Sequence, residues 1–284
     1  MLQNYLDTTM NMTSDIVTLK WMRYIKNDYL VIYASSMAAC ADMHPYQSQR
    51  ELKDEFMSMM GTCDDPDYVK PDEIAEQDLL KLPLVQREKI KAVVDASYSS
   101  ATQVIEAFTK LTTAKSDEDE TTGDETVKSE SEPLPATVID KIRSAMYTKH
   151  GQEQESVIRD AFSKEIKKPV RTSNKFKKGH IICSVTTSDE PHHTIDVYVG
   201  GKHDGMVDDK IVEIKTRQRR FLGTPIYELV QVHTYMYIYG TRQAIIVESY
   251  NGEERKHEIN FDDELWDKVK TKIAEFVEDI LARQ

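Results

Sequence analysis

An acidic segment, SDEDETTGDETVKSESE at residues 116–132, divides the chain and limits where a folded core can lie. It holds eight acidic residues and one lysine and is rich in Ser and Thr. Such a stretch cannot bury enough apolar surface to order its backbone. We therefore expect a disordered linker or loop insertion over 114–136, ending at Pro133 and Pro135. A flexible spacer is its default role; binding a protein partner and mimicry of DNA are the alternatives.

The total net charge of −12 argues at first against a nucleic-acid partner. The acidic segment carries −7 of that total, however, which leaves −5 for the rest of the chain. Within that rest, KEIKKPVRTSNKFKK at 164–178 has seven basic residues against one acid, and KTRQRR at 215–220 has four. A local basic surface is what phosphate binding requires, whatever the global charge. Solvated lysines on an exposed helix and loop are the alternative interpretation of the first run.

Of the 284 residues of the chain, 39% are hydrophobic, which is low but compatible with the core of a globular protein. No uncharged apolar run approaches the roughly 20 residues of a membrane span, and the N-terminal residues do not resemble a secretion signal. We therefore expect an intracellular protein, in the cytoplasm or nucleus, with no membrane partner. Three scattered cysteines, Cys40, Cys63 and Cys183, support neither a disulfide framework nor a four-thiolate metal site.

The spacing of apolar residues predicts two regions that differ in secondary structure. Residues 15–112 keep a helical spacing without an alternating run of strand type, which predicts a helical N-terminal part over 1–113. After the acidic segment, a helix over 137–166 leads into short β-like segments. The later elements are strands at 180–187, 193–207 and 210–216, a helix from Thr224-Pro225 to Gly240, a hairpin of 244–250 and 255–261 around Asn251-Gly252, and a helix from Asp262.

This order of elements predicts an α+β fold. The core over 137–284 is expected to hold a mixed, mostly antiparallel central sheet flanked by helices. The last helix has Phe261 and Trp266 placed for a hydrophobic staple at its start.

The segment HDGMVDDKIVEIKTR at 203–217 carries the most specific chemical pattern. Alternate residues of a strand point to the same face, so Glu213 and Lys215 project together while Val212 and Ile214 face the other way. The pair is either a solvated ion pair or half of an active site. A surface ion pair contributes only about 0–1 kcal/mol, so the pattern alone does not decide between the two.

A second acid in the same segment favours a metal site. Asp204 and Glu213 fall on adjacent strands with only Gly205 to Asp209 between them, so both carboxylates can converge on one ion. Mg²⁺ prefers oxygen ligands and is usually held by one or two carboxylates with water and substrate phosphate. The carbonyl of Ile214 can add a ligand. Lys215 would then stabilise the charge that forms on the phosphorane during hydrolysis.

Two further groups of residues suit this interpretation. Glu155 lies four residues after Gly151 on the predicted helix, from which its carboxylate can reach the same metal. Gln231 and Tyr235 are four apart and so share one face of a helix, where an amide and a phenol can orient a water or contact a phosphate. A half-buried polar face is the alternative for that pair. His233, on a different face, is expected to be an ordinary histidine.

Taken in order, these residues resemble the PD-(D/E)xK nuclease superfamily, specifically its lambda-exonuclease/YqaJ-like, RecB-type branch. The motifs are Gly-x-x-x-Glu at Gly151 and Glu155, Asp-Gly at Asp204 and Gly205, Glu-Ile-Lys at 213–215, and Gln-x-x-x-Tyr at Gln231 and Tyr235. The stretch ASSMAACADMHPYQSQRELKDEF at 34–56 also looks like the YqaJ opening, in which Ser35 begins a small-residue helix and Pro45-Tyr46 follows. The likeness spans roughly 33–250.

The chain also departs from the family pattern. Asp42 stands where the family usually has glycine, and the stretch over 60–136 is longer than a minimal member requires. The iron–sulfur cysteines of the helicase-nuclease and CRISPR-adaptation relatives are missing, which favours the simpler exonuclease branch.

The resemblance implies a restriction-endonuclease-like core and assigns roles to the residues above. Asp204, Glu213 and the Ile214 carbonyl would hold Mg²⁺ or Mn²⁺, with Glu155 supporting that ion or a second one. Lys215 and Gln231 would complete the catalytic set. The residues expected to contact nucleic acid are Ser35, Lys167, Lys168, Arg171, Lys175, Lys177, Lys178, Arg217 and Tyr235.

The sequence therefore predicts a Mg²⁺- or Mn²⁺-dependent deoxyribonuclease, an exonuclease on DNA ends that serves recombination, repair or viral genome processing. An RNA endonuclease or a structure-selective DNA endonuclease on the same core is one alternative, since the metal core acts on the phosphodiester and not on the base. A non-catalytic nucleic-acid-binding protein that retains the fold is another. Polarity of digestion, strand preference and homo-oligomeric state stay open.

Overall fold

The computed structural model describes residues 16–26, 28–60, 71–113, 133–173, 175–187 and 191–282. The whole acidic segment, residues 116–132, lies outside this described part, and so does Cys63. Cys40 and Cys183 are free thiols, the first buried and the second half-buried.

The described chain begins with three strands where the sequence predicted helix, so the helical expectation is wrong for residues 16–33. They are β1 (Ile16–Thr18), β2 (Met22–Ile25) and β3 (Tyr29–Tyr33). In β2 a buried Met22 and Tyr24 flank an exposed Arg23, and β3 is buried at three successive positions. A short apolar run with both faces covered cannot be distinguished from a helix by periodicity, which explains the error.

These N-terminal strands join a five-stranded sheet with strands from the other half of the chain. The sheet order is β1-β2-β3-β5-β4, where β4 is Lys177–Thr186 and β5 is Thr194–Gly201. The β3–β5 pair is parallel and the other pairs are antiparallel. Residues 16–33 are therefore part of the same core as the C-terminal half, and not of a separate helical part.

A second sheet of four strands carries the Glu-Ile-Lys motif. Its order is β6-β7-β8-β9, with β6 at Gly205–Val207, β7 at Lys210–Thr216, β8 at Gln243–Tyr250 and β9 at Glu253–Asn260. The β7–β8 pair is parallel, whereas β8 and β9 form the predicted antiparallel hairpin. Asn251 and Gly252 turn between them with φ of 49° and 84°, as a two-residue hairpin turn with positive φ at both positions requires.

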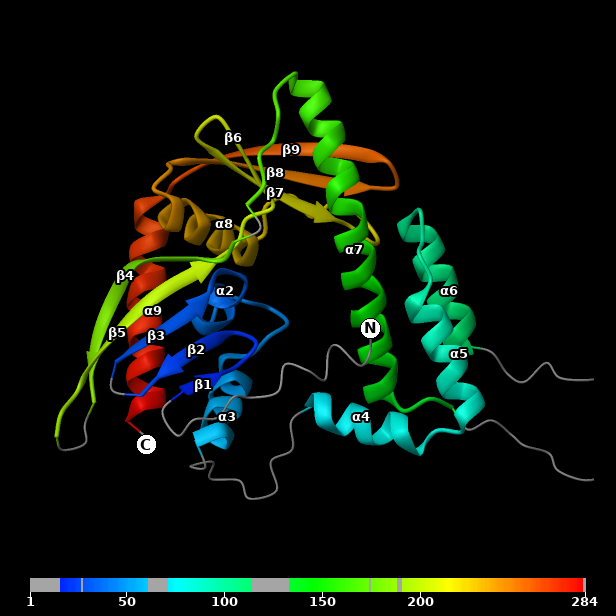
Figure 1. Ribbon diagram of the computed structural model, residues 1–284, viewed down its shortest axis with the longest axis horizontal. Helices are drawn as coiled ribbons and strands as arrows, with labels where there is room; N and C mark the ends of the chain where they lie inside the picture. Colours follow the sequence, from blue (N-terminus) through cyan, green and yellow to red (C-terminus); the bar gives the residue numbers. More distant parts are fainter. Residues whose placement is uncertain are drawn as a thin grey trace, which may run out of the picture.

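Helix α8 (Ile226–Tyr239) lies between the two sheets (Figure 1). It begins after Pro225 and ends at Gly240, whose φ of 71° is the left-handed conformation that glycine adopts readily. Most of its side chains are buried, because it packs against β4, β5, β7 and β8 and also against the short helices η1 (Ala34–Ser36) and α2 (Met37–Cys40). A helix covered on all sides holds its polar residues in fixed positions.

Helix α9 (Asp263–Leu281) closes the core together with α3 (Gln49–Met60). The Asp262 side chain caps α9 by accepting a hydrogen bond from the Leu265 amide at 3.0 Å. The rings of Phe261 and Trp266 lie 6.0 Å apart across the helix start, which confirms the expected staple.

The long helix α7 (Ala136–Ile166) connects this core to a helical part (Figure 1). Ile158 and Phe162, in its C-terminal half, pack on the second sheet with Val212 and Val247. Its N-terminal half packs against α4 (Pro71–Lys81), α5 (Leu84–Asp95) and α6 (Ala101–Thr113). The helical prediction is confirmed for 71–113 and for α7.

The architecture as a whole is a mixed α+β fold flanked by helices, as the sequence predicted. Within the described ranges the strands form two sheets, each with one parallel pair, where one central sheet was expected. None of the helices in the described ranges is long and apolar enough to cross a membrane.

Candidate active site

Asp204 and Glu213 come together where the first sheet passes into the second. After β5 ends at Gly201, the loop that holds Asp204 leads into β6, whose Gly205 pairs with Val212 of β7. The Oδ2 atom of Asp204 accepts a hydrogen bond from the Ile214 amide at 2.8 Å. This contact fixes the Asp204 carboxylate beside the peptide that joins Glu213 to Ile214.

Lys215 connects this acidic pair to α8. Its Nζ atom donates to Glu213 Oε1 at 2.8 Å and to Gln231 Oε1 at 2.9 Å, and Gln231 Nε2 in turn donates to the Tyr235 hydroxyl at 3.3 Å. The Glu213 side chain is 4% exposed and that of Lys215 20%. The pair is therefore not the solvated surface pair that the sequence left open. Because Gln231 and Tyr235 are four residues apart and share one face of α8, both can join this chain of hydrogen bonds.

Burial raises the pKa of both carboxyl groups in this cluster. Desolvation, reinforced by the charge of Glu213, raises the pKa of Asp204 to about 8. Desolvation also raises the pKa of Glu213, although the Lys215 ammonium opposes this shift. The charge of Glu155 on α7 acts in the same direction on both acids. A bound cation would relieve this concentration of buried negative charge.

Lys215 remains a cation in this setting. Burial alone would lower the pKa of Lys215, but the adjacent Glu213 carboxylate raises it further, with smaller contributions from Glu228 and Asp204, so that the net shift is upward. An ammonium with a raised pKa is a hydrogen-bond donor and a fixed positive charge, not a general base.

The residues present fit a divalent ion that takes oxygen ligands. The Oε2 atom of Glu213 is buried, and among the described residues it has no hydrogen-bond partner. Two adjacent carboxylates with a free oxygen are typical of Mg²⁺ sites, in which water and phosphate complete the coordination. Within the described ranges, no three His, Cys, Asp or Glu side chains form a complete metal-binding group. The site therefore offers two protein carboxylates, and the carbonyl of Ile214 as a ligand stays a prediction.

Glu155 lies on α7, within range to influence both acids, but its side chain has a partner of its own. Its Oε1 atom accepts from Arg159 Nη1 at 3.0 Å, one helical turn further along. A role for Glu155 as a metal ligand therefore stays a prediction and would require this ion pair to open.

Two glycines allow the elements of the site to approach closely. A Cβ atom on Gly201 would lie 2.8 Å from the Tyr235 ring and 3.0 Å from the Ala34 Cβ atom, so this glycine lets η1 and α8 meet the end of β5. Ser35 is exposed and follows Ala34 in this short helix, and its contact with a phosphate stays a prediction. A Cβ atom on Gly205 would lie 2.4 Å from Val170 Cγ1, where the connection after α7 crosses β6.

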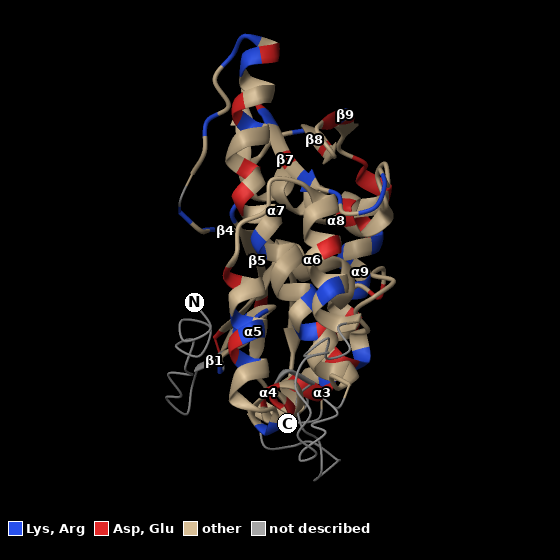
Figure 2. Cartoon of the chain, turned by 90° about the vertical axis from the view of Figure 1, so that its right-hand side faces the viewer, with Lys and Arg blue, Asp and Glu red and all other residues tan. Residues whose placement is uncertain are grey.

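The expected basic surface lies along the connection from α7 to β4 (Figure 2). The side chains of Lys167, Lys168, Arg171, Lys175, Lys177 and Lys178 are all exposed. The backbone of Arg171 pairs with Met206 of β6, which brings this connection next to the Asp204 loop. The Nζ atom of Lys178 lies 4.0 Å from the centre of the Tyr198 ring. The basic run thus leads toward the carboxylates.

Arg217 is not part of that surface, contrary to our expectation. Its side chain is 8% exposed, and its guanidinium binds Glu248 Oε1 at 2.6 Å and the two oxygens of Glu228 at 2.5 and 2.7 Å. It therefore joins the end of β7 to β8 and to the first turn of α8. No local pattern in the sequence could place two acids from distant elements around one arginine.

His233 has the ordinary structural role that we expected. Its Nδ1 atom lies 2.7 Å from the Leu229 carbonyl oxygen, and its Nε2 atom accepts from the Asp262 amide at 2.9 Å. These contacts require a neutral ring with the proton on Nδ1, and they connect α8 to the start of α9.

Beyond these residues, the structure reveals an aromatic group that the sequence interpretation did not assign. His44, Tyr46 and Tyr227 gather at the N-terminal end of α8. The only sequence signal was Pro45-Tyr46 in the opening stretch, noted there for its likeness and not for its chemistry.

Comparison with known families places this arrangement in context. The model of the family described as "YqaJ-like viral recombinase domain" matches residues 89–241, which is more than half of the chain. The matched range contains Glu155, Asp204, Glu213, Lys215 and Gln231, whereas Ser35 lies outside it. No curated protein matches the sequence.

Solved structures give only distant likenesses. An alkaline exonuclease (LHK-Exo) from Laribacter hongkongensis is 15% identical, with a TM-score of 0.37 over 51% of this chain and 80% of that one. A phage-related exonuclease from Haemophilus somnus 129PT is 13% identical, with a TM-score of 0.34 over 72% of this chain and 90% of that one.

Proposed function

Because the chain belongs to the family of YqaJ-like viral recombinase domains, a family of nucleases, we propose that it is a Mg²⁺- or Mn²⁺-dependent exonuclease acting on DNA ends. Its enzyme class is phosphodiester hydrolase. The observation that carries the proposal is the buried group of Asp204, Glu213 and Lys215, in which one carboxylate oxygen of Glu213 has no partner among the described residues.

Each residue of this group has a role that follows from its contacts. Asp204 and Glu213 would hold the ion, with the Ile214 carbonyl as a further ligand and Glu155 as a support from α7. When bound, such an ion polarises phosphate oxygens and lowers the pKa of water. The hydrogen bond from the Ile214 amide keeps Asp204 oriented toward that position.

The Lys215 ammonium would stabilise negative charge on the phosphate as water attacks it. Its two hydrogen bonds, to Glu213 and Gln231, hold Nζ beside the carboxylates, so Gln231 is a positioning residue. Hydrolysis adds water across one P–O bond: the phosphate retains the oxygen of the water, and a proton passes to the leaving sugar oxygen. Tyr235 supports Gln231 through its hydroxyl.

The exposed basic connection between α7 and β4 would bind the phosphate backbone of the substrate and direct it to the site. Ser35, exposed at the other side near Tyr235, would add a hydroxyl contact to a phosphate. Binding of this kind weakens as salt concentration increases, because it depends on the release of counterions.

Digestion of labelled DNA tests the proposal. We expect wild-type protein with Mg²⁺ or Mn²⁺ to degrade a linear duplex labelled at either end and to leave a covalently closed circle intact. The variant Lys215→Ala should lower the rate about 10²- to 10³-fold, since it removes one charge that stabilises the transition state. Lys210→Ala is the matched control, because Lys210 lies on the same strand and pairs with Glu258 at the exposed surface.

Cleavage of the closed circle would replace the exonuclease with an endonuclease on the same core. Full activity of Lys215→Ala would remove the proposed site. Absence of cleavage of any DNA by the wild-type protein, with either metal, would contradict the proposed function.

A further inference from the structure

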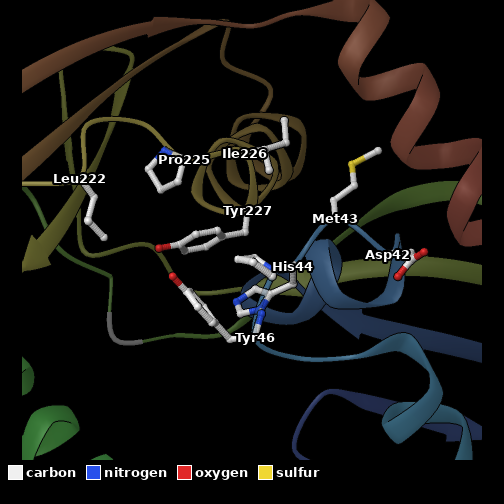
Figure 3. A pocket seen from close by; sticks show the side chains of 9 residues that line it. Asp42, Met43, His44, Tyr46, Leu222, Pro225, Ile226 and Tyr227 are labelled. Atoms are coloured by element: carbon white, nitrogen blue, oxygen red, sulfur yellow. The ribbon is translucent and has the colours of Figure 1, made fainter.

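A hollow of about 460 Å³ opens on the surface beside the N-terminal end of α8 (Figure 3). One wall comes from the loop after α2 and the other from the segment that enters α8. Asp42 is the charged residue of the lining, and the aromatic and apolar part is formed by His44, Tyr46, Leu222, Pro225, Ile226 and Tyr227. Tyr46 is 83% exposed, and Leu222 and Ile226 are each 44% exposed, so the hollow presents rings and aliphatic groups to solvent.

Three rings meet in this hollow. The ring centres of His44 and Tyr227 are 4.8 Å apart, and those of Tyr46 and Tyr227 are 6.3 Å apart. Figure 3 shows the two tyrosine hydroxyls on the same side of the group. Rings with exposed faces and polar edges are suited to a flat ligand with an apolar face and polar edges.

The rings carry no charge. The Nδ1 atom of His44 accepts from the Tyr46 amide at 3.2 Å, which assigns the proton of the neutral ring to Nε2. Burial lowers the pKa of His44 and so favours that neutral form. A neutral aromatic wall binds an uncharged planar group better than it binds a phosphate.

The segment that forms the second wall is held in place by the buried ionic network. The amides of Leu222 and Gly223 donate to the two oxygens of Glu248 at 2.9 and 3.1 Å. Arg217 binds Glu248 and also Glu228 in the first turn of α8. The exposed apolar side chains therefore stand on a fixed backbone, as a preformed site requires.

Helix α8 contributes residues both to the hollow and to the proposed active site. Tyr227 lies four residues before Gln231 and so on the same face of the helix. Burial raises the pKa of the Tyr227 hydroxyl, while the positive charges of Arg217 and Lys215 act against this shift. Tyr227 therefore lies within electrostatic range of the lysine that would contact the phosphate.

We propose that the hollow of His44, Tyr46 and Tyr227 binds an unpaired nucleobase of the DNA strand whose phosphate lies at Lys215. The inference rests on the proposed function and adds a site for the base to one for the phosphate. Bases stack on exposed aromatic side chains irrespective of their identity, so the site is tolerant of sequence. Because both faces of a base inside a duplex are covered by stacking on its neighbours, a base that enters the hollow must first leave the duplex. In this site the exposed ring of Tyr46 stacks on the unpaired base.

Binding of labelled single strands in the absence of metal tests the site without cleavage. The strands are identical except for one abasic residue, placed at successive positions from the end. We expect Tyr46→Ala to raise the Kd for the intact strand about tenfold. For the strand whose abasic residue falls in the hollow, the same variant should change Kd less than twofold. Tyr46→Trp should bind the intact strand as tightly as wild type.

Leu84→Ala is the control, since Leu84 is 61% exposed on α5, away from the hollow. An equal effect of Tyr46→Ala on all strands, or no effect on any, would overturn the inference. So would a change from dimer to monomer in Tyr46→Ala by sedimentation, because a second copy would then occupy the hollow. Wild-type protein that binds bases in this way but cleaves no DNA would contradict the proposed function alone.

Discussion

At the scale of single residues, the site depends on side chains that burial has moved away from their usual behaviour. Burial raises the pKa of the Asp204 and Glu213 carboxyl groups. Hydrogen bonds through Lys215 and Gln231 connect the pair to α8. The proximity of Asp204, Glu213 and Lys215 could be predicted from the sequence. Glu213 and Lys215 are alternate residues of one strand and so point to the same face, and a short turn brings Asp204 next to that strand. The burial that sets their chemistry could not, since it arises from α7 and α8.

His233 gives a prediction about stability and pH. Burial lowers the pKa of His233 in the folded state below its ordinary value of 6.5. The neutral ring therefore stabilises the fold fully above that value, and the contribution is lost as pH falls toward the folded pKa. The contribution of His233 to the free energy of unfolding, measured in urea as wild type minus His233→Gln, should decrease between pH 7.5 and 5.5 by an amount equivalent to at most one proton taken up on unfolding.

His233→Gln should reduce that pH dependence, because it removes the group that takes up the proton. His180→Gln is the control, since His180 is exposed on β4. The same pH dependence in His233→Gln as in wild type would show that other groups account for it.

At the scale of elements, the buried ionic network holds β7, β8 and α8 together at the edge of the site. Arg217 is placed by Glu228 and Glu248, which are 3% and 0% exposed. The Glu248 carboxylate also accepts from the two amides of the 222–223 turn. We infer a structural role for Arg217 in place of the DNA contact expected from the basic run.

Arg217→Met separates these two roles. The variant should destabilise the fold by about 3–5 kcal/mol, because it leaves two buried carboxylates without their cation. Arg219→Met, a change at an exposed position in the same turn, should alter stability by less than about 0.5 kcal/mol. Urea unfolding measures both. Weaker DNA binding by Arg217→Met at unchanged stability would restore the DNA-contact role.

At the scale of the whole molecule, the two halves of the sequence share one core. The elements after residue 136 could be predicted because they have strong turn and capping signals, such as Asn251-Gly252 in the hairpin and Asp262 before α9. Strands β1 to β3 could not, because they are short and because β3 is stabilised by its parallel pairing with β5, far along the chain. For the same reason the aromatic hollow, built from residues 42–46 and 222–227, has no local signature.

The proposed function requires that Asp204 and Glu213 hold a divalent cation. Calorimetric titration of Mn²⁺ into the metal-free protein tests it most directly, because it requires neither DNA nor turnover. Wild-type protein should take up the ion with accompanying heat, and Asp204→Asn and Glu213→Gln should each lose that uptake while keeping a cooperative unfolding transition. No uptake by the wild-type protein, or undiminished uptake by both folded variants, would contradict the claim.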